Sequence, residues 1–246
     1  MSDAISTGGW TATLIQAGTL PMDGTDLAPA GALPATLAVP SNVLVLQGHG
    51  RTILVDTAAG GRAGEWEGAV EDLDGALAAA GVDASQIDTV VLTHLDFDHC
   101  GGIEHDGRPA FAGARIVVSP EAAAWAAEAN DPAAAAIRAM DAAGLLDVAG
   151  YGEEIASGVS LAAAPGHRVG HSIVLAGEAT YLADVVHHPA HVANLTWDRV
   201  FDSDPELALA TRRRILAETA GPVACSHIAG WGRIERSPDG LSWDPL

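Results

Sequence analysis

Short apolar runs rich in valine, isoleucine and leucine recur along the chain, and glycine, proline or aspartate bounds most of them. Two such runs, 43–46 and 52–55, flank the Gly-His-Gly segment 48–50, a pattern typical of a β-hairpin. The continuous apolar run 87–93 predicts a strand that is buried on both faces. The same reasoning predicts further strands at 115–119, 159–163, 172–175, 180–183, 223–226 and 232–236.

Between these strands, apolar residues recur at the three- and four-residue spacing of helices. The stretch 65–80 has this spacing, and Gly81 ends it. Proline at the first position predicts alanine-rich helices at 120–129 and 132–143. A longer amphipathic helix, 204–220, begins with an aspartate cap followed by proline.

The order of these elements predicts one domain over residues 1–246. Each half of the chain contains both sheet and helix, which favours an α/β sandwich of two sheets flanked by helices. The chain has 246 residues, 48% of them hydrophobic, and this is enough to bury a sizeable core. No segment has the composition of a linker between independent domains.

The charge balance excludes several classes of function. Acidic residues outnumber basic ones by 32 to 12, so the formal net charge is −20 with neutral histidine, and every basic residue is arginine. A chain without lysine forms no Schiff base, anchors no pyridoxal phosphate and has no GxxxxGK phosphate-binding loop. The acidic balance also makes nucleic acid an unexpected partner and disfavours anionic metabolites.

Neither export nor membrane insertion is indicated. The first ten residues lack the segments of a secretory signal, and the longest apolar stretches fall far short of the ~20 residues that a membrane helix needs. Two cysteines, Cys100 and Cys225, are too few for a disulfide framework, and we expect both to be buried, inert thiols. We therefore expect a cytoplasmic protein.

The densest group of ionisable side chains directly follows the strand predicted at 87–93. Within Thr-His-Leu-Asp-Phe-Asp-His-Cys-Gly-Gly, four potential metal ligands occupy six positions: His94, Asp96, Asp98 and His99. Imidazoles and carboxylates at this density are typical of a metal site, because a cation gives them a shared partner. The competing interpretation is a polar loop that caps the next helix, and the full constellation disfavours it.

Other candidate ligands lie where predicted strands meet loops, the usual location of sites built on a sheet scaffold. The loop 165–172 carries His167 and His171 directly before a predicted strand. Asp184 and His227 each follow a predicted strand. Each of these residues is weak evidence alone, but together with the preceding motif they indicate a metal centre.

With these residues the chain resembles the metallo-β-lactamase-fold hydrolase superfamily. The signature of that superfamily is His-x-His-x-Asp-His after a strand, then Gly-His, a bridging Asp and a final His. The resemblance covers nearly the whole chain and is nearest to the subgroup of N-acyl-homoserine lactonases and methyl parathion hydrolase, the latter through 184–187, 201–204 and 212–214. It implies an αβ/βα four-layer sandwich that binds two divalent metal ions.

The resemblance also implies two ligand groups that share Asp184 as a bridge. Their members are His94, Asp96 and His171 for the first metal, and Asp98, His99 and His227 for the second. Asp96 stands where the signature has its second histidine. Zinc is the expected metal, and this carboxylate favours iron or manganese more than an all-histidine site would. The alternative is that Asp96 turns away and one ion binds.

Such a site implies hydrolysis by a metal-bound hydroxide, with Asp98 and Asp184 orienting the nucleophile and shuttling its proton. His188 or its neighbour His187 would protonate a leaving group or face substrate, unless both are solvated in a loop. No serine lies in a Gly-x-Ser-x-Gly motif, which disfavours a serine hydrolase.

Other prominent side chains are interpreted as structural. We expect His167 outside the ligand set, and the arginines at 212–214 on a solvated, ion-paired helix face. Trp197, Phe201 and Trp231 lie in the core or along an apolar pocket.

The expected function is that of a metal-dependent hydrolase acting on a small neutral lactone or ester, with phosphotriesters as related substrates. An iron-dependent redox enzyme, a β-lactam hydrolase and a metal-free binding protein are the alternatives. We expect neither nucleic acid nor a membrane as a partner, and a homodimer stays open.

Overall fold

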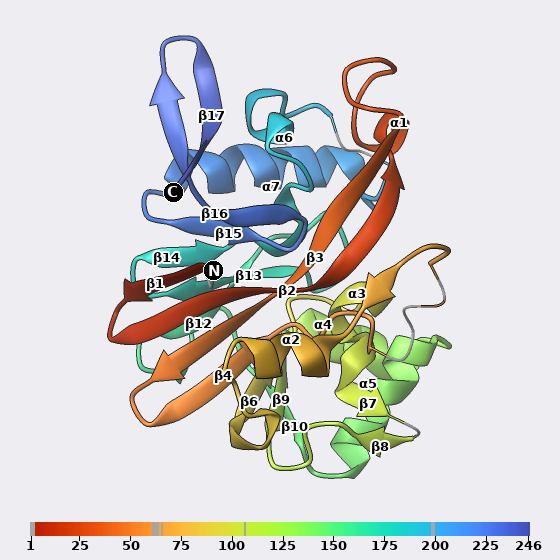
Figure 1. The fold of residues 1–246 in the computed structure, drawn as a ribbon. Helices are drawn as coiled ribbons and strands as arrows, with labels where there is room; N and C mark the ends of the chain where they lie inside the picture. The colour runs from red at the N-terminus through yellow and green to blue at the C-terminus, as the bar shows by residue number, and fades with distance from the viewer. Residues whose placement is uncertain (1–2, 61–63, 65, 106, 198–199) are drawn as a thin grey trace.

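Two β-sheets packed face to face form the centre of the molecule, and helices cover the outer face of each sheet (Figure 1). The computed structural model of the chain describes residues 3–60, 64, 66–105, 107–197 and 200–246. One outer layer contains α7 (Pro205–Glu218), and the opposite one contains α2 (Leu73–Ala79), α4 (Pro120–Glu128) and α5 (Pro132–Ala142). This αβ/βα arrangement confirms the predicted fold class.

The first sheet has eight strands within the described residues, in the order β1–β2–β3–β4–β6–β9–β10, with β5 paired to β2. Their bounds are β1 Asp3–Thr7, β2 Trp10–Asp23, β3 Thr36–Gly48, β4 Arg51–Val55, β5 Val70–Glu71, β6 Thr89–Val91, β9 Arg115–Val118 and β10 Leu146–Val148. From β4 to β10 neighbouring strands are parallel. Parallel neighbours need crossover connections, and α2 and the α4–α5 pair supply two of them.

The predicted hairpin is confirmed, because β3 and β4 pair antiparallel around a two-residue turn. His49 and Gly50 in this turn have φ values of 49° and 71°, which match the twist of a tight hairpin. Alternation along β3 sends Val43 into the core beneath the helices and Leu44 into the core between the sheets. The strand is therefore apolar on both faces.

The second sheet has seven strands within the described residues, in the order β11–β12–β13–β14–β15–β16–β17. Their bounds are β11 Glu154–Ala156, β12 Val159–Ala163, β13 Ser172–Ala176, β14 Ala179–Tyr181, β15 Val223–Cys225, β16 Ile228–Ser237 and β17 Gly240–Pro245. Only β14 and β15 pair in parallel among these described strands, and α6 and α7 lie in the connection between them. Short elements complete the fold: α1 Gly24–Leu27, α3 Phe97–Cys100, α6 Ala190–Ala193, β7 Glu104–His105, β8 Arg108–Pro109 and the 3₁₀ turns Ala84–Gln86, Gly101–Ile103 and Ala183–Val185.

Hydrogen bonds between the sheets fix the strand ends that carry the candidate ligands. The Ser172 backbone N–H, at the start of β13, donates to the Thr93 carbonyl at 2.9 Å. The Asn42 amide donates to the Cys225 carbonyl at 3.0 Å, and the Tyr181 hydroxyl donates to the Asn42 carbonyl at 2.9 Å. These buried links hold the ends of β6, β14 and β15 in a fixed mutual position.

Most predicted elements are present with shifted ends, but the helix predicted at 65–80 begins only at Leu73. Val70–Glu71 pairs with β2 instead, and Asp72 caps the helix by accepting the Gly75 N–H. Position 65 itself lies outside the described residues. Both cysteines are buried, as predicted. No helix in the described part of the chain has the length and apolar character needed to cross a bilayer.

Candidate metal centre

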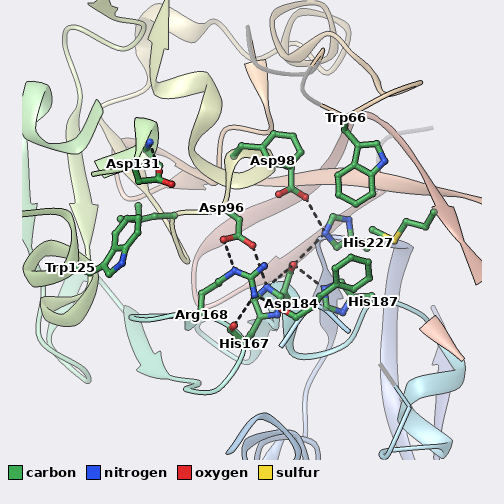
Figure 2. Close-up of a pocket in the computed structure, with 15 residues that line it drawn as sticks. Trp66, Asp96, Asp98, Trp125, Asp131, His167, Arg168, Asp184, His187 and His227 are labelled. Atoms are coloured by element: carbon green, nitrogen blue, oxygen red, sulfur yellow. Dashed lines mark hydrogen bonds and ion pairs between the residues drawn. The ribbon is translucent and has the colours of Figure 1, made fainter. Parts of the chain in front are cut away.

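Four loops bring ionisable side chains together at one place in the molecule (Figure 2). These loops follow β6, β14 and β15 and connect β12 to β13. They contribute five imidazoles and three carboxylates: His94, His99, His167, His187, His227, Asp96, Asp98 and Asp184. The structure thus brings together every predicted ligand except His171.

A buried strand and a short helix position the ligands of the sequence motif. β6 ends at Val91, and His94 follows it as a fully buried side chain. Asp96 precedes the first turn of α3, yet within the described chain its side chain makes no capping hydrogen bond. Its carboxylate instead lines the cavity, as does that of Asp98 in the first turn.

Asp184 lies at the centre of the cluster. Its Oδ2 lies 3.1 Å from Nε2 of His187, 3.3 Å from Nε2 of His99 and 3.4 Å from Nε2 of His227. The preceding Ala183 has a φ of 49°, a left-handed conformation that is unfavourable for a residue with a Cβ and turns the chain sharply after β14. One carboxylate oxygen among so many imidazoles is placed as a bridging ligand would be.

Two compact groups of three side chains accompany Asp184. In the first, which we call the first donor set, Asp96 Oδ2 lies 3.8 Å from His94 Nε2 and 3.7 Å from His167 Nε2. The three ligand atoms lie within 4.8 Å of one another. This spacing allows all three to face a single ion.

The second donor set consists of Asp98, His99 and His227. Asp98 Oδ2 lies 3.6 Å from Nε2 of each histidine, and the set meets the same 4.8 Å limit. His99 and Asp184 also form a compact group with His94. The two donor sets are therefore neighbours that share a central carboxylate.

The imidazoles of both donor sets are held from behind at Nδ1. The groups that hold them are Asp56 for His99 at 2.9 Å, Asp202 for His167 at 3.2 Å, the Pro40 carbonyl for His227 at 3.0 Å and the Thr93 hydroxyl for His94 at 3.1 Å. An acceptor at Nδ1 fixes the ring orientation and leaves Nε2 as the atom that faces the cluster.

Burial and mutual charge perturb the pKa values of the cluster. Burial opposes a charge on His99, but the carboxylates of Asp184, Asp98 and Asp56 outweigh it and raise the His99 pKa well above its ordinary value. Burial likewise disfavours ionised Asp184, yet the neighbouring imidazoles hold its pKa well below the usual range. Burial, together with the charge of His99, lowers the pKa of His94 well below its ordinary value. The centre of the cluster is thus anionic, and in the metal-free chain protonated His99 balances part of this charge. A metal ion would replace the proton on such a ring.

The donor chemistry fits divalent metal ions. Among the described residues, Nε2 of His94, Nε2 of His99 and Oδ1 of Asp184 are buried and make no hydrogen bond. Buried polar atoms are normally satisfied, and a divalent cation would supply the missing partner. Mixed imidazole and carboxylate donors are compatible with zinc, iron or manganese.

His171, which was predicted as a ligand, belongs to none of the compact groups among the described residues, and its ring centroid lies 4.9 Å from that of His94. Its Nδ1–H donates to the Ala164 carbonyl at 2.8 Å, and its Nε2 accepts the Asp184 backbone N–H at 3.3 Å. Burial, together with His167, lowers the pKa of His171 to about 3. His167 was expected outside the ligand set, but its Nε2 lies with the ligand atoms of His94 and Asp96 in one compact group.

The adjacent histidines after Asp184 have different surroundings. His187 is buried, lines the cavity and reaches Asp184 Oδ2 with its Nε2. His188 is half-buried, and its Nδ1 accepts the backbone N–H of Ala190. His187 is among the described residues that line the cavity, and His188 is not.

A cavity of about 390 Å³ opens onto the cluster (Figure 2). Its apolar wall consists of Met22, Trp66, Leu95, Phe97, Trp125, Ala133 and Phe201. The prediction that aromatic side chains line a pocket holds for Phe201. Trp231 lies in the core between the sheets, and neither it nor Trp197 is among the described lining residues.

One arginine of the helix α7 is buried, although the sequence predicted a solvated position for it. Arg212 is 1% exposed and donates to the carbonyls of Val185, Leu195 and Trp197, with Asp202 3.5 Å away. The prediction for this residue was therefore wrong, because its side chain joins the loops behind the cluster. Arg214 lies at the surface beside Glu218, as expected.

Comparisons with solved structures find similar folds over almost the whole chain. AidC, a dizinc quorum-quenching lactonase in complex with the product N-hexanoyl-L-homoserine, has a TM-score of 0.86 at 21% identity, covering 100% of this chain and 97% of its own. The hydrolase AbOPH of the beta-lactamase superfamily has a TM-score of 0.82 at 22% identity, with the same coverage.

A third structure has a lower similarity. It is an N-acyl homoserine lactone hydrolase with the product N-hexanoyl-L-homoserine bound at the catalytic metal centre, with a TM-score of 0.70 at 20% identity. The match covers 91% of this chain and 94% of that one. At these identities the likeness establishes the fold alone.

A comparison with curated proteins finds no match. The family model of the metallo-beta-lactamase superfamily matches residues 36–227, a span that includes both donor sets and Asp184. The match covers most of the chain and agrees with the four-layer fold. The chain belongs to the metallo-β-lactamase superfamily.

Proposed function

We propose that this metal-dependent hydrolase cleaves a neutral lactone or ester, with phosphotriesters as related substrates. The observation that carries the proposal is the set of side chains that line the cavity. Its described lining contains four carboxylates, Asp96, Asp98, Asp131 and Asp184, but a single arginine, Arg168, whose Nε donates to Asp96 at 2.8 Å. The two ions of the proposed site would offset these carboxylates, but the described lining offers no uncommitted basic side chain to bind an anionic group. A neutral substrate would instead meet the apolar walls.

Two divalent ions complete the proposed site. The first donor set would hold one, the second donor set would hold the other, and Asp184 would lie between them. Zinc is the metal we propose first, with iron and manganese as alternatives that the carboxylate of Asp96 favours. When bound, a pair of such ions activates water at neutral pH and polarises the oxygen of the scissile carbonyl or phosphoryl group.

The chain's own residues would orient and protonate the substrate. Asp98 is the carboxylate of the second donor set and lines the cavity, so it is placed to hold the proton of the attacking water. His187 lies on the cavity wall with Nε2 beside Asp184, and we propose that it binds or protonates the leaving oxygen.

The aromatic wall supports an apolar substituent on the substrate. Trp66 packs against Phe97 with ring centroids 6.1 Å apart and against Phe201 at 6.5 Å. All three rings line the same cavity as Asp98 and His187. The neighbours described as lactonases make a lactone with an apolar acyl group the first substrate class to test.

The test is a panel of lactones, aryl esters and phosphotriesters assayed with the metal-loaded protein. Each neutral compound is paired with an analogue that carries one carboxylate at the same position. We expect the neutral member to be hydrolysed at least about tenfold more efficiently, because an added carboxylate would lose its hydration without gaining an uncommitted basic side chain in the described lining. Preferred hydrolysis of the anionic member would contradict the proposal.

The route of hydrolysis is tested in a single turnover in ¹⁸O-labelled water. No serine, threonine or cysteine lies among the described residues of the cavity lining, so we expect the label to enter the product without any protein adduct. An acylated or phosphorylated protein trapped by rapid quenching would contradict this mechanism.

A further inference from the structure

Asp96 is held in place by an arginine from another segment of the chain. Arg168 Nε donates to Asp96 Oδ1 at 2.8 Å across 72 positions of sequence (Figure 2). The other oxygen, Oδ2, is the one that faces His94 and His167. The arginine therefore occupies one side of the carboxylate and leaves the other side to the first donor set.

Arg168 itself is anchored on several sides. Its Nη1 donates to the His167 carbonyl at 2.9 Å, to the Phe201 carbonyl and to the Ser203 hydroxyl at 3.4 Å. The guanidinium group is planar and rigid, so these bonds fix the direction of Nε as well. A cation committed in this way is poorly placed to capture an anionic substrate.

Asp96 needs such support more than the other carboxylates do. Its side chain is 25% exposed, compared with 11% for Asp98 and 4% for Asp184. It makes no capping bond within the described part of α3, and burial raises its pKa while Arg168 opposes the rise. Without the arginine, the carboxylate would be able to rotate into the cavity.

The ion pair also limits the negative charge of the cluster. Asp98 and Asp184 already contribute two carboxylates, and Asp96 adds a third. An aspartate paired with an arginine has no formal net charge, so the pair adds an oxygen ligand without adding negative charge to the site.

We propose that Arg168 is a positioning residue that orients and neutralises Asp96, so that the two side chains act together as one neutral ligand of the first donor set. The proposal rests on the metal centre of the proposed function and not on its substrate. It concerns the affinity for the metal, which is measurable without any hydrolysis.

The test is a double-mutant cycle of Arg168→Gln and Asp96→His, read out by competition for Zn²⁺ between the metal-free protein and a chromophoric chelator. In the wild-type background we expect Arg168→Gln to weaken the more weakly bound ion about ten- to a hundredfold, the usual cost of removing a group that orients a ligand. In the Asp96→His background, Arg168 has lost its acceptor and its charge repels the ion. There Arg168→Gln should leave the affinity unchanged or raise it.

Matched variants separate this role from simple support of the loop. Ser203→Ala removes one contact of Arg168 Nη1 without touching Asp96, and we expect it to leave the Zn²⁺ affinity within about twofold. Arg168→Lys keeps the positive charge but loses the planar, rigid arrangement of the guanidinium donors. The Zn²⁺ affinity of this variant should therefore fall toward that of Arg168→Gln. Thermal unfolding of each metal-free variant reports any general loss of stability.

Equal weakening by Arg168→Gln in both backgrounds would overturn the proposal, because it would show that the arginine acts without Asp96. Tighter binding in the wild-type background would also overturn it, since charge alone would then dominate. Wild-type protein that binds no divalent ion would refute the metal centre and the pair together. Protein that binds two ions but hydrolyses none of the panel would refute only the substrate class.

Discussion

The two donor sets of the metal centre use the same kinds of side chain, but the protein supports them differently. In the second donor set, His99 is backed by Asp56, a 1% exposed carboxylate that also accepts the Thr93 backbone N–H at 2.8 Å. In the first donor set, Asp96 is partly exposed and depends on Arg168, a third of whose side chain is exposed. The imidazoles of both sets are held from the core, but the carboxylate of the first set is held from the cavity wall.

This difference suggests unequal affinity for the two ions. A buried network is already ordered before a cation arrives, whereas an exposed ion pair is weakened by solvent and salt. We therefore expect the second donor set to bind first and more tightly. The first donor set, whose carboxylate is the more exposed one, is expected to exchange its ion more readily and to respond more strongly to substitution.

The largest effect is expected from Asp184, because it is common to both donor sets. Asp184→Asn removes the charge that faces four imidazoles within 3.5 Å. We expect both ions to bind more weakly and hydrolysis to fall by well over about a hundredfold, the loss that already follows from removing a supporting group. Elemental analysis and kcat/KM measure the two effects, and full retention of both would show that Asp184 bridges nothing.

The next largest effect distinguishes His167 from His171. His167→Asn should remove the ion of the first donor set and spare that of the second. His171→Asn should keep both ions, because the native ring uses both nitrogens in hydrogen bonds to Ala164 and Asp184. The metal content of the two variants after gel filtration tests this prediction. Loss of an ion from His171→Asn but not from His167→Asn would show that His171 is the ligand.

A smaller effect on turnover alone is expected from His187. His187→Ala should retain the second donor set's ion and lower kcat by about a hundredfold, the lower range for a lost general acid. His188→Ala provides the matched control and should change kcat by less than about threefold, because its ring bonds to its own loop. Equal effects of the two substitutions would remove His187 from its proposed role.

The smallest effect concerns the pH dependence of stability in the metal-free protein. The His171 pKa is about 3 in the folded chain and 6.5 ordinarily, so between these values only the unfolded chain binds the proton. Stability should therefore fall as the pH drops from about 6.5 toward 3, by at most about 1.4 kcal/mol per pH unit from this residue. The unfolding free energy, measured by urea unfolding at several pH values, should depend less steeply on pH in His171→Asn than in the wild type. An identical pH dependence would contradict the lowered pKa of His171.

Much of the metal centre was predictable because its ligands follow strands with a clear apolar pattern. His94, Asp184 and His227 each come just after such a strand, and strand ends in a sandwich converge. Asp56 follows β4 in the same way, so its position was an available signal for a group that supports the ligands.

The choice between neighbouring histidines was not predictable from the sequence. His167 and His171 lie in one loop, but His167 Nε2 lies 3.7 Å from Asp96 Oδ2, whereas His171 Nε2 lies 3.3 Å from the Asp184 backbone nitrogen. His187 and His188 are adjacent, so their opposite directions depend on the chain path after Asp184. Periodicity does not specify such paths in irregular segments.

Two further features escaped prediction for physical reasons. β2 extends over 14 residues but contains Gly18 and Pro21, residues that normally interrupt strands, and its register shifts between Gln16 and Gly18. Arg212 was expected in solvent because arginine is rarely buried, yet carbonyl groups of the loops behind the cluster satisfy its donors.

The number of divalent ions bound per chain tests the metal centre most directly. Metal-free protein is reconstituted separately with excess zinc, manganese or iron, freed of unbound metal by gel filtration and measured by elemental analysis. With two donor sets around Asp184, we expect two ions per chain with at least one of these metals, released in two steps by increasing chelator. At most one ion per chain with every metal would contradict the two-set centre.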